Sequence, residues 1–192
     1  MSAHQTNAAM ATGASATEPC DTHDFAALYQ AWSGPVHRWI RALGGPAIDA
    51  DDLTQEVFIV VQRQLERFRG ANLGGWLYRI AQLTVRDHRR RAWYRHVFLR
   101  SRDVALDEIV SPASAPDERL DRREREVLVY RLVDQLSPRW RYSFLLYELC
   151  GLSGDEIATM VGLPPPTVRT HLSRARKEIG GLMARLHARG EL

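Results

Sequence analysis

The clearest chemistry in the sequence is a basic surface of the kind that binds nucleic acid. Near the C-terminus, polar and basic side chains recur at spacings that place them on one face of a helix: Arg169, Thr170, Ser173, Arg174 and Lys177. Guanidinium groups and hydroxyls suit phosphate oxygens and the base edges of the DNA major groove. An ordinary helical hairpin with a solvated basic face is the alternative interpretation.

Charge is distributed unevenly along the 192 residues, whose formal net charge is only +3. The interval 86–102 holds seven arginines and one aspartate, and the interval 165–192 holds six basic residues and two acids. Between them, residues 103–126 hold eight acids and four arginines. Two basic zones separated by an acidic stretch indicate two contacts with one polyanion, or one polyanion and a separate partner.

Other chemistry finds little support. The seven histidines and the two cysteines, Cys20 and Cys150, show no metal-ligand spacing, and no Ser/His/Asp arrangement or phosphate-binding glycine loop is present. We therefore predict a protein that is not an enzyme and has no metal or other cofactor. No run of about 18 apolar residues and no signal-peptide pattern occurs, so we expect a cytoplasmic protein without membrane insertion.

The first basic zone follows a segment with helical apolar spacing. Apolar residues recur at three- and four-residue steps over residues 25–43, and Ser33-Gly34-Pro35 is expected to kink or split this helix. Asp49 is a suitable N-cap for a second helix, which should run to Phe68. The sequence therefore predicts two helices ahead of the basic zone.

A third helix is predicted to carry the basic run 86–91. It should start near Trp76, after a loop over residues 69–75 that contains three glycines. Trp76 falls in the apolar stripe of this helix, so we expect it in the core rather than stacked on a base. A solvated basic tail is the alternative interpretation of the run.

The second basic zone lies in a helix-turn-helix pattern. Residues Ser153-Gly154-Asp155-Glu156 have the sequence of a capping box, and Gly162 is a suitable end for the helix that follows. Pro165-Pro166-Thr167 then opens a second helix. A short capped helix, a turn with glycine and a basic helix are typical of a DNA-binding helix-turn-helix.

These elements predict an all-α fold of two small helical domains joined by a flexible linker, the C-terminal domain containing the helix-turn-helix. The linker is recognised by a Ser-Pro-Ala-Ser-Ala-Pro stretch without clear periodicity. We place a disordered tail at residues 1–23, the first domain at 24–98, the linker at 99–118 and the second domain at 119–192.

Two blocks of the sequence resemble two domains of bacterial sigma factors, in the same order. The segments that resemble the second sigma domain are residues 51–58 (DDLTQEVF), 68–70 (FRG) and 76–81 (WLYRIA). The segments that resemble the promoter-binding fourth domain are residues 134–139 (DQLSPR), 151–158 (GLSGDEIA) and 167–176 (TVRTHLSRAR). Because only a short linker separates the blocks, the chain resembles the extracytoplasmic function (ECF) group of RNA polymerase sigma factors.

The resemblance implies a protein that binds core RNA polymerase and directs promoter-specific transcription initiation. The residues that would dock on core polymerase are Asp52, Gln55 and Glu56. Those that would melt and read the minus-ten element are Ala71, Asn72, Leu73, Arg79, Gln82, Leu83, Arg86 and Arg89. Those that would read the minus-thirty-five element are Thr167, Arg169, Thr170, Ser173, Arg174 and Arg176.

Two residues depart from the family's pattern. Leu83 stands where many members carry an asparagine that hydrogen-bonds a base, which a leucine side chain is unable to do. Pro166 stands where members often have glycine, and proline lacks the N–H that a phosphate would accept from. The promoter preference near these two positions is therefore open.

The partners that the resemblance implies are core RNA polymerase, promoter DNA and an anti-sigma protein. Helix capping is the alternative role of the acidic start of the second helix. A stand-alone helix-turn-helix regulator is the alternative function, although it leaves the acidic patch and the arginine-rich third helix without a joint purpose. An enzyme acting on nucleic acid would lack any acid, base or metal set.

Overall fold

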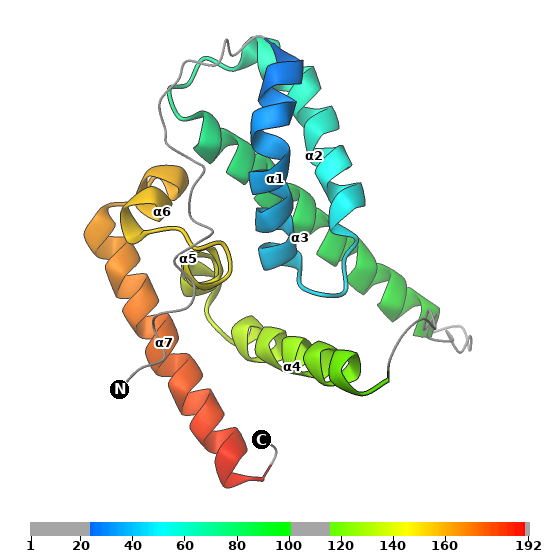
Figure 1. The fold of residues 1–192 in the computed structure, drawn as a ribbon, viewed down its shortest axis with the longest axis vertical. Coiled ribbons are helices and arrows are strands. Elements are labelled where there is room, and N and C mark those ends of the chain that lie inside the picture. Colours follow the sequence, from blue (N-terminus) through cyan, green and yellow to red (C-terminus); the bar gives the residue numbers. More distant parts are fainter. Residues whose placement is uncertain (1–23, 101–115, 191–192) are drawn as a thin grey trace.

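The structure is a computed structural model that describes residues 24–100 and 116–190. Within these ranges the chain forms helices and turns and no strand, so the predicted all-α fold is confirmed (Figure 1). The expected tail and most of the expected linker lie outside the described residues. The helices are α1 (Phe25–Gly44), α2 (Ala50–Gln64), a 3₁₀ turn η1 (Leu65–Arg67), α3 (Leu73–Arg100), α4 (Pro116–Asp134), α5 (Pro138–Glu148), α6 (Gly154–Val161) and α7 (Pro165–Ala188).

Helix α1 is continuous through Pro35, so of the two predicted outcomes, a kink or a split, the split does not occur. Proline removes one backbone hydrogen bond from a helix, but burial of the following turns offsets this loss. Val36 and Ile40 are fully buried, and Trp39 is buried beside them. The helix ends at Gly45, whose positive φ of 79° is a conformation that glycine adopts without strain.

The start of α2 was predicted correctly, and its end was not. The Asp49 carboxylate accepts hydrogen bonds from the backbone N–H groups of Asp51 (3.0 Å) and Asp52 (3.1 Å), as an N-cap does. The α-helix then stops at Gln64 and tightens into η1, four residues before the expected end at Phe68. Such a 3₁₀ turn is common where an α-helix ends.

Helix α3 begins at Leu73, three residues before the predicted start, and this corrects the expected loop over residues 69–75. The side chain of Asn72 explains the difference, because its Oδ1 accepts a hydrogen bond from the N–H of Gly75 at 2.8 Å. Asparagine is a preferred N-cap residue. Because of this cap, the first turn of the helix includes Gly74 and Gly75, although glycines are typical of loops.

The helix-turn-helix is formed by α6 and α7, as predicted. Ser153 N–H donates to the Glu156 carboxylate (2.7 Å) and Glu156 N–H donates to the Ser153 hydroxyl (3.3 Å), which completes the capping box. Gly162 ends α6 in the left-handed conformation with φ 70°. Helix α7 then opens at Pro165, and Val168 and other apolar residues of its inner face are buried.

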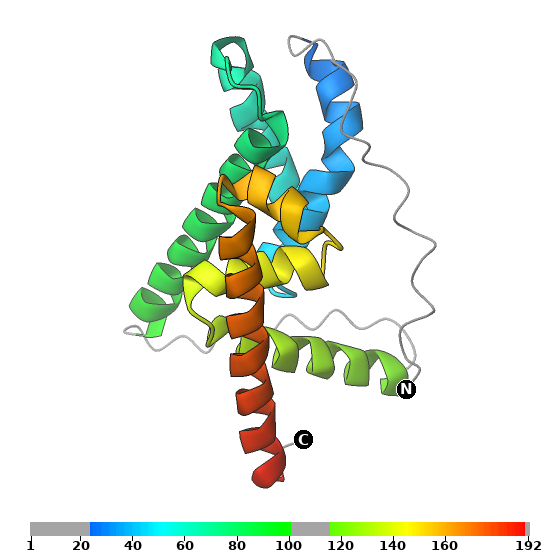
Figure 2. The same ribbon diagram turned by 90° about the vertical axis from the view of Figure 1, so that its left-hand side faces the viewer.

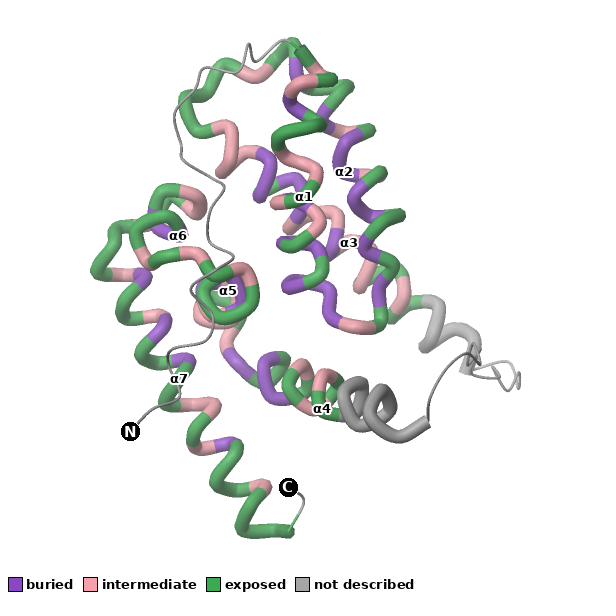
Figure 3. The backbone as a smooth tube through the Cα atoms, viewed as in Figure 1, coloured by how far each residue is buried: buried purple, intermediate pink, exposed green. Residues whose placement is uncertain are grey.

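The two halves of the chain pack against each other. Figure 1 and Figure 2 show α6 beside the first turns of α3, and α5 against α1. Buried residues line the inner faces of the helices in both halves (Figure 3). Leu146 of α5 and Ile157 of α6 belong to the same buried cluster as Ile40 of α1 and Leu77 of α3. One apolar cluster thus extends through both halves.

Candidate nucleic-acid interface

An acidic patch lies on the first turns of α2. Asp52 and Gln55 are exposed, and Glu56 is half-buried one turn along the helix from Asp52. Positions three and four residues apart share one helix face, so these side chains form a single patch. The Glu56 carboxylate lies 3.9 Å from the Arg91 guanidinium of α3. Such a patch has the chemistry to accept arginine side chains from a partner.

The turn before α3 presents three of the predicted minus-ten residues close together. Ala71 and Asn72 are exposed and Leu73 is half-buried. Besides capping α3, Asn72 donates a hydrogen bond from Nδ2 to the backbone carbonyl oxygen of Thr159 in α6, at 2.6 Å. Trp76 is half-buried, packs against the core, and its ring centroid lies 4.7 Å from that of Phe68. Trp76 thus lies at the edge of the core, and its role in the core rather than on a base stays a prediction.

The other predicted minus-ten residues follow the outer face of α3. This face is fixed because the opposite stripe, which includes Leu77, Ala81 and Val85, is buried. The Arg79 guanidinium donates to Gln82 Oε1 at 3.1 Å, which holds these two side chains together. The predicted residues on the outer face or at its edge are Arg79, Gln82, Leu83, Arg86 and Arg89.

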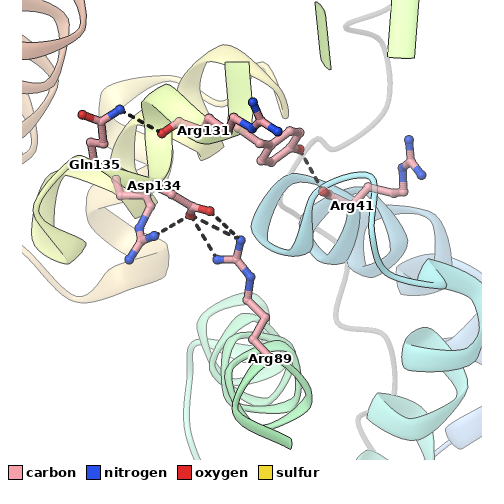
Figure 4. A network of polar contacts seen from close by, with 7 residues as sticks. Arg41, Arg89, Arg131, Asp134 and Gln135 are labelled. Atoms are coloured by element: carbon pink, nitrogen blue, oxygen red, sulfur yellow. Dashed lines mark hydrogen bonds and ion pairs between the residues drawn. The ribbon is translucent and has the colours of Figure 1, made fainter. Parts of the chain in front are cut away.

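Arg89 is held by an acid from the other half of the chain, as Figure 4 shows. Its guanidinium donates to both carboxylate oxygens of Asp134 at the end of α4, at 3.1 to 3.3 Å. Arg141 of α5 donates to the same carboxylate at 2.6 Å. Sequence reasoning missed this contact, because Arg89 and Asp134 are 45 residues apart and no local spacing links them.

The predicted minus-thirty-five residues lie on the outer side of α7. Arg169, Ser173 and Arg174 are exposed, whereas Val168 and Leu172 turn inward and are buried. Thr167 is half-buried in the first turn, where the Pro166 carbonyl accepts a hydrogen bond from the Thr170 hydroxyl at 2.9 Å. The departure at Pro166 therefore leaves the first turn of the helix intact.

Two basic residues of α7, Arg174 and Arg176, touch aromatic rings of α5. The Arg174 guanidinium lies 5.7 Å from the Trp140 ring centroid. That of Arg176 lies 4.8 Å from the Tyr147 ring and donates to Glu148 at 3.1 Å. The hydrogen bond to Glu148 also raises the pKa of Arg176. Arg176 is thus engaged within the protein, which the sequence pattern did not indicate.

Three further observations concern metal sites, membrane spans and the free cysteine. Within them, no group of three or more His, Cys, Asp or Glu side chains gathers as a metal site. Among the helices in the two described ranges, none combines the length and apolar character that crossing a bilayer requires. Cys150 is a free thiol near the Arg38 carbonyl, and burial raises its pKa to about 11, so it is a weak nucleophile at neutral pH.

Comparison with known families assigns both halves of the chain to one class of protein. Residues 28–95 match the family described as Sigma-70 region 2, and residues 126–179 match Sigma-70, region 4. The first range contains the acidic patch and most of α3, and the second contains the helix-turn-helix. The chain therefore has the two domains of a sigma-70-type factor, regions 2 and 4.

Similarity to individual proteins identifies the family within this class. The chain is 32% identical over 140 residues to the ECF RNA polymerase sigma-E factor of Escherichia coli, covering 70% of this chain and 73% of that protein. It is 37% identical over 143 residues to the RNA polymerase sigma-H factor of Pseudomonas aeruginosa, covering 69% and 72%. The chain belongs to the extracytoplasmic function (ECF) family of RNA polymerase sigma factors.

Solved structures show a similar fold. The structure of CnrH in complex with the cytosolic domain of CnrY has a TM-score of 0.56 at 22% identity, covering 84% of this chain and 88% of that one. The sigma factor RpoE of Bartonella quintana, solved with the anti-sigma factor NepR, has a TM-score of 0.53 at 22% identity, covering 84% and 97%.

Proposed function

We propose that this protein binds core RNA polymerase and brings it to promoters through two DNA-reading surfaces, one on α3 and one on α7. The observation that carries the proposal is that each surface is a basic helix face backed by a buried apolar stripe, with arginines exposed on α3 (Arg79, Arg86) and on α7 (Arg169, Arg174). The same chain also carries the acidic patch of α2, which suits a protein partner. The alternative function, a stand-alone regulator, does not explain the acidic patch of α2.

Docking on core polymerase falls to the acidic patch of α2. Asp52, Gln55 and Glu56 present two carboxylates and an amide within about one helical turn. The cap formed by Asp49 uses neither the Asp52 nor the Glu56 side chain, so helix capping leaves Asp52 available to a partner. Glu56 would exchange its contact with Arg91, at 3.9 Å, for one with the partner. A basic partner surface would pair with them.

Reading of the minus-ten element falls to the start and the outer face of α3. Ala71, Asn72 and Leu73 would border an unstacked base, and Arg79 and Gln82 would follow the strand from there. Unpaired bases are held by adaptable polar groups next to guanidinium planes, and the strand backbone by positive charge. Leu83 would offer an apolar contact at a position where other members offer a hydrogen bond. Arg86 and Arg89 would bind phosphates further along.

Reading of the minus-thirty-five element falls to α7. Arg169 and Arg174 are exposed on its outer side, with Thr170 and Ser173 beside them. An arginine forms two hydrogen bonds to a guanine edge, and hydroxyls contact either bases or phosphates. Thr167 would meet the DNA backbone at the start of the helix. Arg176 would contact phosphate after leaving Glu148.

Several further properties follow from the family. The protein would act in the cytoplasm, without catalysis or a bound cofactor, and would use residues 24–98 and 119–192 as two working domains joined by the segment 99–118. We also propose an anti-sigma partner. The support for it is that the similar sigma factor of Bartonella quintana was solved with an anti-sigma factor.

Footprinting with and without core polymerase tests this function against its alternative. A library of genomic fragments is incubated with the protein alone, with core polymerase alone, and with both. We expect protected sites about 25 base pairs apart only when both are present. Strong protection by the protein alone would instead identify a stand-alone regulator that binds its own operator.

A further inference from the structure

The ring of Trp140 in α5 lies against an arginine of α7, the helix proposed to read the minus-thirty-five element. The Arg174 guanidinium carbon is 5.7 Å from the centroid of the Trp140 ring. Trp140 is half-buried, and Arg174 is exposed. A guanidinium within about 6 Å of a ring centroid is attracted to the face of the ring, and tryptophan is the best of the aromatic residues in this role. The contact therefore restricts the Arg174 side chain in the free protein.

The position of the Trp140 ring is itself fixed by packing between the two helices. Figure 2 shows α5 crossing the first half of α7. One turn along α5 from Trp140, Ser143 is buried, and its hydroxyl oxygen lies 3.4 Å from Nδ1 of His171 in α7. Leu146 of α5 and Leu172 of α7 belong to the same buried cluster. Because side chains three residues apart share one helix face, Trp140 and Ser143 face α7 together.

An aromatic face leaves the hydrogen-bond donors of a guanidinium free. Arginine has five N–H donors, and recognition of a guanine edge uses a pair of them. Arg176, two residues further along α7, is held differently, because its guanidinium donates to the Glu148 carboxylate at 3.1 and 3.3 Å. A carboxylate takes up donors that DNA would need. Helix α5 thus orients Arg174 through a ring face, whereas it engages the donors of Arg176.

We propose that Trp140 is a positioning residue for promoter reading, whose ring holds Arg174 ready for a guanine edge of the minus-thirty-five element. This inference rests on the proposed function of α7. A freely rotating arginine side chain loses conformational entropy when it binds, and part of that loss has already occurred when a ring holds the side chain. The ring also restricts the directions in which the guanidinium points. The preference at one base pair thus depends on a residue of the neighbouring helix.

Substitutions in α5 separate the ring from the bulk of the side chain. Trp140→Leu removes the ring and keeps an apolar side chain, and Trp140→Phe retains a ring face. The matched control is Tyr147→Leu, which removes from the same helix the ring that lies 4.8 Å from Arg176. Because Arg176 is assigned to phosphate, loss of its ring should leave base preference unchanged. Circular dichroism of each variant measures whether the helices are retained.

Nuclear magnetic resonance of the free full chain measures whether the ring holds the arginine. The Nε–H signal of Arg174 is assigned by its absence from the spectrum of Arg174→Lys, and a proton over a ring face is shifted upfield by the ring current. We expect an upfield Arg174 signal in the wild type and in Trp140→Phe, and loss of that shift in Trp140→Leu. An Arg174 signal at one position in the wild type and in Trp140→Leu would overturn the proposal.

The promoter affinity of the complex with core polymerase measures whether holding the arginine matters. Titrations use a promoter located by the footprinting experiment, and the same promoter substituted at the base pair whose preference Arg174→Ala relaxes. We expect Trp140→Leu to lower affinity for the wild-type promoter about threefold, and to lower the preference at that base pair to a similar extent. Trp140→Phe should stay within about twofold of the wild type. The salt slope should not change, because no charge is removed.

A double-mutant cycle separates positioning from a direct contact between the ring and DNA. In the Arg174→Ala background, Trp140→Leu should have no further effect, because the ring acts through Arg174. An equal loss of affinity in both backgrounds would overturn the proposal, since the ring would then act on DNA or on the fold by itself. A relaxed base preference in Tyr147→Leu would overturn it too, because the effect would then belong to any ring of α5.

The inference and the proposed function fail in different ways. If footprinting locates no promoter, or if Arg174→Ala leaves promoter affinity and base preference unchanged, the reading role of Arg174 fails and the inference about Trp140 fails with it. If Arg174→Ala lowers affinity and relaxes the preference while Trp140→Leu does neither, only the inference about Trp140 fails.

Discussion

The side chain of Asn72 joins the two halves of the protein while it caps α3. Its Nδ2 donates to the Thr159 carbonyl oxygen at 2.6 Å, and its Oδ1 accepts from the Gly75 N–H at 2.8 Å. The amide therefore uses its donor for the contact between the halves and its acceptor for the local helix start. The two roles are separable by substitution.

Replacement of Asn72 by aspartate should keep the cap and lose the contact between the halves. A carboxylate still accepts from Gly75, but it has no donor for Thr159. Asn72→Ala loses both and should lower the free energy of unfolding by a further ~1 kcal/mol, the usual worth of an N-cap. Urea unfolding followed by circular dichroism measures both variants. Equal stabilities of the aspartate and alanine variants would contradict the capping role.

Charge reversal of the acidic patch should weaken the complex with core polymerase. Asp52→Lys combined with Glu56→Lys replaces two carboxylates that would face a basic surface, so we expect affinity to fall by about tenfold or more. Glu66→Lys, at an exposed acid in η1, is the control. Fluorescence titration with purified core polymerase provides the measurement. A loss within about twofold would leave the patch as a helix end without a docking role.

Arg169→Ala and Arg174→Ala should each reduce promoter affinity by about 1–3 kcal/mol if the arginine pairs with a guanine, and should relax the preference at that base pair. Arg176→Ala should have a smaller effect that is uniform across sequences, because Arg176 first has to leave Glu148. Titrations on wild-type and base-substituted promoters at several salt concentrations distinguish these cases. Arg185→Ala, near the end of α7, is the control.

If all three variants bind as the wild type does while their circular dichroism is unchanged, α7 is not the reading helix. A change in the salt slope of about one unit, without a change in base preference, would instead assign that arginine to phosphate alone. The salt series therefore separates base contacts from phosphate contacts.

The capping box should make α6 sensitive to acid. The hydrogen bond from Ser153 lowers the pKa of Glu156, so the folded state favours the ionised carboxylate. This contribution to stability is present above the unfolded pKa of a glutamate and is lost as the pH falls through the lower folded pKa. Urea midpoints of the wild type and Glu156→Gln should therefore converge in acid. A constant difference at all pH values would contradict this linkage.

Sequence patterns predicted the elements whose causes are local. Asp49 and the Ser153/Glu156 capping box were predicted because a cap and its partners lie within three residues of each other. The exposed face of α7 was predicted because helical periodicity separates it from Val168 and Leu172. The class of fold and the helix-turn-helix followed from these local signals.

Contacts between distant residues were not predictable in the same way. Asp134 meets Arg89 across 45 residues, and Glu148 meets Arg176 across 28, so neither pair leaves a spacing signal. The start of α3 was missed for a different reason. Two glycines favour a loop by propensity, but the side chain of Asn72 supplies the acceptor that lets the helix begin before them.

Run-off transcription tests the central claim most directly. Purified core RNA polymerase is incubated with genomic fragments, with and without this protein, and the transcripts are sequenced. The account predicts discrete transcripts that appear only with the protein and that disappear when Asp52→Lys and Glu56→Lys are combined. As a control, the same core polymerase is shown to respond to another sigma factor. Transcripts that are then identical with and without this protein would contradict the account.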